Sequence, residues 1–327
     1  MHFRSFARLF TTWLLVCAAG SFAHADDNSQ PWPASLLPAR AAALVAATDA
    51  LEKTTSALCE RTNQERLDLA RAAWRDAMVA WRAYEPLAVN PGARAAIDSG
   101  VANAPRIEAA VRQYTEDPTQ SNTGPADFGL PAIEYLFWGD ARAKAQLGRL
   151  AFKQRCAYTH YLTTDVARAA SALTDSTAAK ASGVPVSAYL DNLLALLDTI
   201  NATRLGSATA PSYSDAAVAV DAWRSEQGKA ALGATLDTLG SMLLSNDGNP
   251  NPLSQQAGTT WAATGPQNLK ASLEQIRSLL AAQPGDLADA FRRNSKTARQ
   301  LREAMVSLRG QVATLRQAIA DQGKQGK

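Results

Sequence analysis

The chain has 327 residues, with 33 basic and 30 acidic side chains and a formal net charge of +3. This length is more than one small core needs, and it indicates two subdomains or one long double bundle. Basic and acidic residues are nearly balanced, so the chain lacks the large excess of positive charge that is typical of proteins that bind nucleic acid or anionic membranes.

Residues 1–25 have the pattern of a secretory signal peptide: two arginines, then an apolar run, then a small-residue cleavage site that ends at Ala25. We expect export to the periplasm or cell envelope and a mature chain of residues 26–327. Cleavage removes two arginines and no acidic residue, so the formal charge falls from +3 to +1. A lipoprotein anchored at Cys17 is the less favoured alternative, because Val16 stands where a small residue is expected. No second stretch approaches the roughly 20 apolar residues of a membrane span.

The first two expected helices carry a regular apolar face. Leu44, Leu51 and Leu58 recur at helical spacing in the first, and Asn63 is a plausible N-cap for the second. The stripe of the second helix continues at the same spacing to Glu85, directly before a proline that ends the helix. A glutamate at a helix end is usually partly exposed, so its position alone leaves the burial of Glu85 open.

A loop rich in Asp, Pro, Ser, Asn and Gly spans residues 115–128 and leads into a short helix over 129–139. Pro131 suits the first turn of this helix and Gly139 its end. Glu134 is the one charged residue between them, and the other positions are apolar or aromatic, so the helix should be packed on all sides. A buried carboxylate must be hydrogen-bonded, paired, metal-bound or protonated. Two explanations stay open: Glu134 faces the dipole of its own helix, or it belongs to a functional polar cluster.

The remaining sequence predicts further helices and one long loop. From Phe291 to Ile319, apolar residues repeat every three or four positions and predict a long helix. Its expected partner is an antiparallel helix over 267–280. The other expected helices span residues 105–114, 143–170, 186–203 and 229–244, and the expected loop spans 245–266.

These patterns predict an all-α fold of up-and-down helical bundles, since no run alternates as a strand would. The segment 221–224 reads Asp-Ala-Trp-Arg and echoes the Ala-Trp-Arg-Asp of residues 73–76. Such an echo fits an old duplication, with halves at about residues 34–180 and 186–322.

The run Gly129-Leu130-Pro131-Ala132-Ile133-Glu134 resembles the signature of the imelysin-like family, bacterial proteins of the periplasm or cell surface that are often under iron control. In that family a G-x-H-x-x-E helix is the proposed metal and peptidase motif. Here Pro131 occupies the histidine position. The chain is more similar to the iron-regulated branch, whose motif reads G-L-P-A-[IL]-E-Y-L. The motif residues marked by this resemblance are Gly129, Pro131, Glu134, Tyr135 and Trp138.

Two shorter matches extend the candidate site. Residues 80–85, Ala-Trp-Arg-Ala-Tyr-Glu, resemble the A-W-x-x-x-E of the family's Trp-rich helix, which makes Glu85 the second candidate carboxylate. Residues 223–225, Trp-Arg-Ser, resemble a segment that recurs in this branch. We therefore expect Arg82 or Arg224 to pair with Glu134, and Asp127 to contribute from the entry loop. The resemblance also implies two related four-helix-bundle halves.

The residue inventory argues against a zinc hydrolase. The mature chain has one histidine, His160, and contains neither H-E-x-x-H nor G-x-S-x-G. It also lacks the glycine-rich loops of nucleotide sites. Hard cations such as ferric iron or calcium accept carboxylates without histidine. Glu134 and Glu85 are thus the expected ligands if a metal binds, although the sequence requires no cofactor.

Cys59 and Cys156 are the two cysteines of the mature chain. In an oxidising compartment two well-placed thiols tend to pair. Two separate buried thiols are the alternative, and we predict the disulfide.

Two functions follow from this sequence. The first is a non-enzymatic periplasmic protein of the imelysin-like family, linked by resemblance to iron acquisition. It would bind a metal, a chelate, or a protein partner such as an iron-uptake component or another cell-envelope protein. The second is a metal-dependent peptidase, which the family's name implies and the missing motif histidine disfavours. Oligomeric state and the identity of the ligand stay open.

Overall fold

The computed structural model describes residues 34–89, 91–100, 102–114, 128–139, 145–180, 184–206, 220–244 and 252–325. Residues 31–327 form one compact unit. The predicted signal peptide and Asp127 lie outside the described residues. Within these, the regular structure is helical and the β-bridges are isolated pairs, so the all-α prediction is confirmed. None of the described helices has the length and apolarity that crossing a membrane would take.

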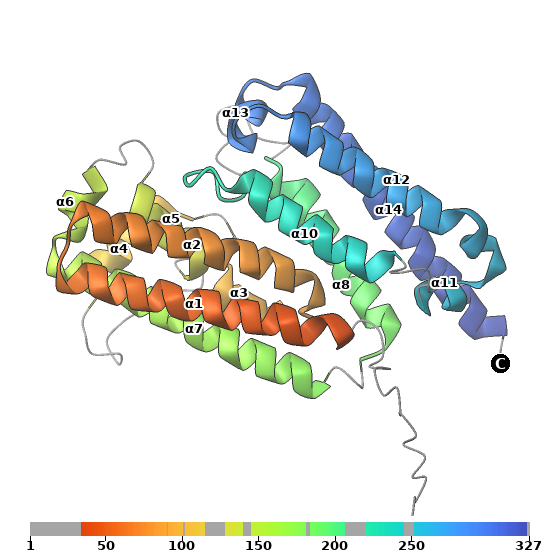
Figure 1. Ribbon diagram of the computed structural model, residues 1–327, viewed down its shortest axis with the longest axis horizontal. Coiled ribbons are helices and arrows are strands. Elements are labelled where there is room, and N and C mark those ends of the chain that lie inside the picture. Colours follow the sequence, from red (N-terminus) through yellow and green to blue (C-terminus); the bar gives the residue numbers. More distant parts are fainter. Residues whose placement is uncertain are drawn as a thin grey trace, which may run out of the picture. The chain divides into compact units, whose positions relative to one another are not determined.

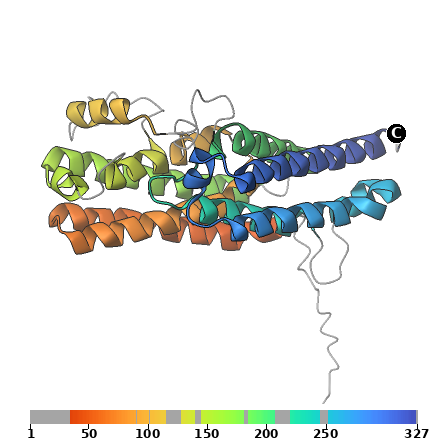
Figure 2. The same cartoon turned by 90° about the horizontal axis from the view of Figure 1, so that it is seen from above.

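Three long helices build the first part of the unit (Figures 1 and 2). The helix α1 (Leu37–Glu60), after the short turn η1 (Ala34–Leu36), packs against both α2 (Gln64–Tyr84) and α7 (Lys153–Lys180). Their apolar faces match the predicted spacing, and Asn63 caps α2 by accepting a hydrogen bond from the backbone N–H of Arg66 at 2.9 Å.

A disulfide joins Cys59 near the end of α1 to Cys156 in the first turn of α7. The two Cα atoms lie 5.5 Å apart and are separated by 97 positions in the sequence. This confirms the predicted pairing. The bond ties the two ends of a long stretch of chain that contains α2 and the motif helix.

The motif segment forms the helix α5 (Gly129–Trp138), and all ten of its residues are buried. It is covered by α2, α7 and the shorter helices α3 (Pro91–Ile97), α4 (Ala104–Gln113) and α6 (Gln146–Leu150). Gly129 has φ +82°, and a Cβ there would lie 2.4 Å from the carbonyl oxygen of Ile97. Glycine is therefore required where α5 begins.

The second part contains the long C-terminal helix and its partners. The helix α14 (Lys296–Gln325) packs against both α12 (Gly258–Ala282) and α8 (Val186–Thr199) (Figure 2). The repeating apolar residues of α14 are buried from Leu301 to Leu315, which confirms the predicted helix pair. The predicted start at Phe291 is wrong, because the chain leaves the helix at residues 293–295 and Phe291 lies in the separate helix α13. The other elements are the π-helix η6 (Ile200–Arg204), α10 (Gly228–Leu243), α11 (Pro252–Gln256) and α13 (Leu287–Arg292).

The two parts meet where α2 ends. The helix α10 packs along α2, and both α8 and α10 contact the short turn η2 (Glu85–Leu87). The boundaries of the two predicted halves stay a prediction. The echoed segments differ locally, since Trp74 lies in α2 and Trp223 lies in a turn.

Two predicted elements are wrong in part. The helix expected over 143–170 is interrupted at residues 151–152, between α6 and α7, and α7 continues to residue 180. The loop expected over 245–266 is helical from residue 252 apart from a turn at residue 257. Leu253, Trp261 and Leu269 are buried at multiples of four, so tertiary packing outweighs the glycines and prolines of this stretch. The Trp261 ring packs over Gly265, where a Cβ would clash with it.

Candidate functional site

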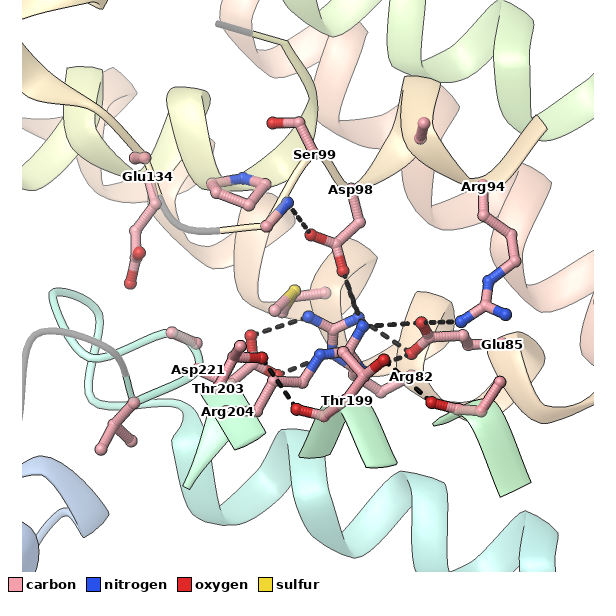
Figure 3. A pocket seen from close by; sticks show the side chains of 18 of the residues that line it. Arg82, Glu85, Arg94, Asp98, Ser99, Glu134, Thr199, Thr203, Arg204 and Asp221 are labelled. Atoms are coloured by element: carbon pink, nitrogen blue, oxygen red, sulfur yellow. Dashed lines mark hydrogen bonds and ion pairs between the residues drawn. The ribbon is translucent and has the colours of Figure 1, made fainter. Parts of the chain in front are cut away.

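A cavity of about 740 Å³ lies where the two parts of the unit meet. Its walls come from the second half of α2, from η2, α3 and the first turns of α5, and from α8, η6 and the turn over 220–224. Polar and charged side chains from these elements converge there (Figure 3). A concave site of this size is typical for small-molecule ligands.

Arg82 is the centre of one wall of the cavity. Its guanidinium donates to both carboxylate oxygens of Asp221, each at 2.7 Å, and its Nη1 also contacts Glu85 at 3.0 Å and Asp98 at 2.5 Å. The Arg82 side chain is 2% exposed. A bidentate, buried pair of this kind fixes orientation as well as charge. We call Arg82, Glu85, Arg94, Asp98, Arg204 and Asp221 the paired wall.

Glu85 is buried and meets three arginines. Its oxygens accept from Arg82 at 3.0 Å, from Arg94 at 2.7 Å and from Arg204 at 2.7 Å on each oxygen. Burial raises the pKa of Glu85, but the guanidinium groups of Arg204, Arg82 and Arg94 outweigh it and hold that pKa well below its usual range. Glu85 is therefore an ionised structural partner at all ordinary pH values.

The end of α2 explains why Glu85 and Arg82 sit at a junction. Pro86 has no N–H to give to the carbonyl of Arg82 four residues earlier. Thr235 on α10 donates to that carbonyl at 3.3 Å, and Thr238 donates to the carbonyl of Ala83 at 2.7 Å. The second part of the unit thus satisfies the orphan carbonyls of α2.

Backbone contacts bring the other members of the paired wall into place. Asp98 forms an isolated β-bridge with Gly129, at the start of α5. Arg204 ends the π-helix η6, and its carbonyl accepts from the N–H of Asp221 at 3.0 Å. Thr199 at the end of α8 and Thr203 and Arg204 of η6 line the cavity, and π turns are frequent at functional sites.

Glu134 lies on a different wall and is 3% exposed. Its Oε1 accepts from the backbone N–H and the hydroxyl of Ser225, each at 2.8 Å. The nearest guanidinium nitrogen, Nη1 of Arg224, lies 3.9 Å from Oε2. Burial raises the pKa of Glu134 to about 7, against the opposing effects of Arg224 and Ser225. Its carboxylate points into the space between α5 and the paired wall (Figure 3).

The turn that carries Ser225 is conformationally strained. Ala222 has φ +52° and Glu226 has φ +59°, values that residues with a Cβ rarely adopt. The turn delivers Asp221 to Arg82 and Ser225 to Glu134. Strained backbone of this kind is a recurrent feature of functional sites.

Arg224 is held by aromatic rings. Its guanidinium carbon lies 4.5 Å from the ring centre of Trp223 and 5.4 Å from that of Tyr135. Tyr135 in turn donates its hydroxyl to Glu108 at 2.7 Å. These contacts orient Arg224 beside Glu134 without a hydrogen bond between the two.

The predicted pairing of Arg82 with Glu134 is wrong, because Arg82 is taken up by three other carboxylates. Arg224 does lie beside Glu134, at 3.9 Å, so Glu134 is buried near a cation as predicted. Glu85 and Glu134 line the same cavity but have separate partners. Asp127 is not among the described residues. The functional roles of these residues remain a prediction.

Five contributors to the site were not predicted: Arg94, Asp98, Arg204, Asp221 and Ser225. Asp221 and Ser225 lie within the short Trp-Arg segment that the sequence singled out, so a signal for them existed. Arg94, Asp98 and Arg204 stand in short or irregular elements without a distinctive pattern. Their position follows from tertiary contacts.

His160, the one histidine of the predicted mature chain, lies away from the cavity. His160 on α7 pairs with Glu52 on α1 at 2.9 Å, and neither lines the cavity. Within the described residues, no group of three or more His, Cys, Asp or Glu side chains is placed to hold a metal ion.

Two solved structures from bacteria have a similar arrangement of helices. A putative iron-regulated protein A precursor from Parabacteroides distasonis matches 86% of this chain and 91% of its own, with 12% identity and a TM-score of 0.65. An imelysin-like protein from Psychrobacter arcticum matches 84% of this chain and 89% of its own, with 18% identity and a TM-score of 0.53. At these identities the likeness defines the fold.

The family follows from the sequence model. The imelysin family model, also called peptidase M75, matches residues 37–326. The chain therefore belongs to the imelysin family, as the motif around Glu134 predicted. No functionally curated protein matches the chain.

Proposed function

We propose that the protein is a non-enzymatic binding protein of the periplasm or cell envelope, which takes up a small metal chelate in the cavity as part of iron acquisition. The observation that carries this proposal is the cavity of about 740 Å³ at the junction of the two parts, walled by charged side chains already fixed in place. Preformed sites with few, well-oriented polar groups are typical of ligand binding.

A chelate is favoured over a bare cation because of how the carboxylates are paired. Glu85 and Asp98 each contact at least two guanidinium groups, and Asp221 is held by both of its oxygens. A metal ion would have to displace these arginines and leave them buried without partners, which is costly. A molecule that brings its own metal ligands avoids that cost.

The link to iron comes from resemblance. The motif of residues 129–136 is similar to the iron-regulated branch of the family, and one structure with this fold is described as an iron-regulated protein A precursor. The predicted signal peptide supports export to the compartment in which such chelates are met. A protein partner from iron uptake would then receive or deliver the chelate.

The proposal is tested by calorimetric titration of residues 26–327 with ferric trihydroxamate and ferric citrate. Each metal-free chelator is titrated in parallel. Ala188, on α8, lines the cavity, and Ala188→Trp should occupy part of it and weaken binding of a chelate at least tenfold. Ser187→Trp on the same turn, outside the lining, is the matched control. Absence of chelate binding, or equal binding by Ala188→Trp, would contradict the proposal.

A further inference from the structure

Glu134 differs from the other carboxylates of the cavity in its distance from the nearest guanidinium group. Among the described lining residues, Glu85, Asp98, Asp191 and Asp221 each have a guanidinium nitrogen within 3.0 Å. The corresponding distance for Glu134 is 3.9 Å. Both hydrogen bonds from Ser225 end on Oε1, so Oε2 is left with acceptor capacity inside the cavity.

Arg224 lies too far from Oε2 to donate a hydrogen bond to it. Its guanidinium is stacked against Trp223 and Tyr135, with ring-centre distances of 4.5 and 5.4 Å. These aromatic contacts fix the cation beside Glu134, at a distance beyond a normal hydrogen bond. Oε2 thus faces a space that a donor from a ligand can occupy.

The pairing of charges in the lining points to the sign of that donor. Four arginines and five carboxylates of the described residues line the cavity. Asp191 is paired with a fifth arginine, Arg316, from outside the lining, so the charges balance by number. Glu134 differs because its cation lies beyond hydrogen-bond distance, and an ionised carboxylate accepts most strongly from a charged donor. The lining carboxylates are Glu85, Asp98, Glu134, Asp191 and Asp221, and the lining arginines are Arg82, Arg94, Arg204 and Arg224.

The surroundings of Glu134 indicate what carries the charge. Trp74, Met78, Pro131 and Trp223 line the cavity near the motif helix and offer apolar surface. The indole N–H of Trp74 is already used, since it donates to the carbonyl of Leu130 at 2.8 Å. A hydrated inorganic cation would gain little from such walls, whereas an organic amine would bury its carbon skeleton there.

We propose that Glu134 Oε2 accepts a hydrogen bond from the ammonium group of a small organic ligand whose apolar body lies against Trp74, Met78 and Trp223. This subsite deepens the proposed function, because it assigns a primary amine to the chelate that the cavity takes up. The ammonium group donates to Oε2, Ser225 keeps its two bonds to Oε1, and the paired wall stays unchanged.

The test uses two pairs of probes that differ by one acetyl group. The first pair is a ferric trihydroxamate with a pendant primary amine and the same chelate with that amine acetylated. The second is 2-phenylethylamine and its N-acetyl derivative. Calorimetric titrations are made at pH 8, where Glu134 is ionised, with the wild-type protein, Glu134→Gln and Asp198→Asn. Asp198 is an exposed carboxylate on α8 outside the cavity lining, so it is the matched control.

The wild-type protein should prefer the free amine by at least tenfold, as a charge-assisted hydrogen bond provides. Glu134→Gln should abolish the preference, and Asp198→Asn should keep it. Equal affinity for amine and acetyl forms in both pairs, or an unchanged preference in Glu134→Gln, overturns the subsite. If both chelates bind equally and 2-phenylethylamine shows no preference, the proposed function stands without the subsite. If neither chelate binds but 2-phenylethylamine shows a preference that depends on Glu134, the subsite stands and the proposed function fails.

Discussion

The two charged walls of the cavity contain the same kinds of side chain in opposite states. On the paired wall, Arg82 and Glu85 have all their charge matched by close partners, and the pKa of Glu85 lies well below its usual range. On the other wall, Glu134 lacks a close guanidinium and its pKa rises to about 7. Burial is nearly complete for both glutamates, so the difference comes from their partners.

This comparison separates scaffold from site. The paired wall joins α2, η2 and α3 to η6 and the turn at Asp221, two regions more than 100 positions apart in the sequence. Its charges are matched by one another and fix the geometry of the cavity. The carboxylate of Glu134 is oriented by Ser225 and still has an open oxygen, which is the state expected of a binding group.

The largest effect is expected from breaking the paired wall. Arg82→Met leaves Glu85, Asp98 and Asp221 without their shared cation in a buried place, and should lower the free energy of unfolding by about 5 kcal/mol. Urea denaturation measures it. Arg309→Met, which removes an exposed pair with Asp198, is the control and should leave the midpoint nearly unchanged. A small loss in Arg82→Met would show that the wall is not structural.

The disulfide gives a benchmark of comparable size that involves no charge. Replacing Cys59 and Cys156 by serine opens a loop spanning 97 positions and should cost about 4 kcal/mol by the chain-entropy estimate. The loss should be the same at pH 5 and pH 8, in contrast to changes at Glu134. Titration of the unfolded, unreduced wild-type protein should find no free thiol, and two free thiols would refute the bond.

The Glu134 wall should respond to pH. Between about 4.5 and 7, unfolded Glu134 loses its proton while the native protein keeps it, so wild-type stability falls as pH rises. Glu134→Gln does not titrate, and its stability relative to wild type should therefore increase by about 3 kcal/mol across this range. Arg224, Ser225 and Asp221 are the groups that face Glu134 and are common to both proteins. A difference that is constant with pH would mean an ordinary pKa for Glu134.

The last prediction is that the protein has no peptidase activity. Purified residues 26–327 should show no chelator-sensitive peptidase activity, because Pro131 replaces the motif histidine and His160 lies away from the cavity. A protease assay with and without a strong chelator tests this. Cleavage that disappears with chelator and in Glu134→Ala would restore the peptidase interpretation.

Local patterns predicted much of the fold but less of the site. The spacing of apolar residues predicted α1, α2 and α14, and the all-apolar surroundings of Glu134 predicted its burial. The partner of Arg82 was mispredicted, because a Trp-Arg pair indicates that an arginine is buried and not which carboxylate it meets. Arg204 was missed because it lies at the end of a π turn whose sequence has no distinctive pattern, and its place follows from its contact with the distant Glu85.

The most direct test of the contrast is to measure the two carboxyl groups by carbon-detected NMR titration, with Glu134→Gln and Glu85→Gln used to assign the signals. We expect Glu134 to titrate near pH 7 and to shift to lower pH when the amine-bearing chelate binds in its gallium form, which is diamagnetic and leaves the signal visible. Glu85 should show no titration step between pH 3 and pH 9. A Glu134 signal that titrates near the ordinary glutamate value of about 4.5, or one that does not move with the chelate, would contradict the assignment of Glu134 as the ligand-binding group.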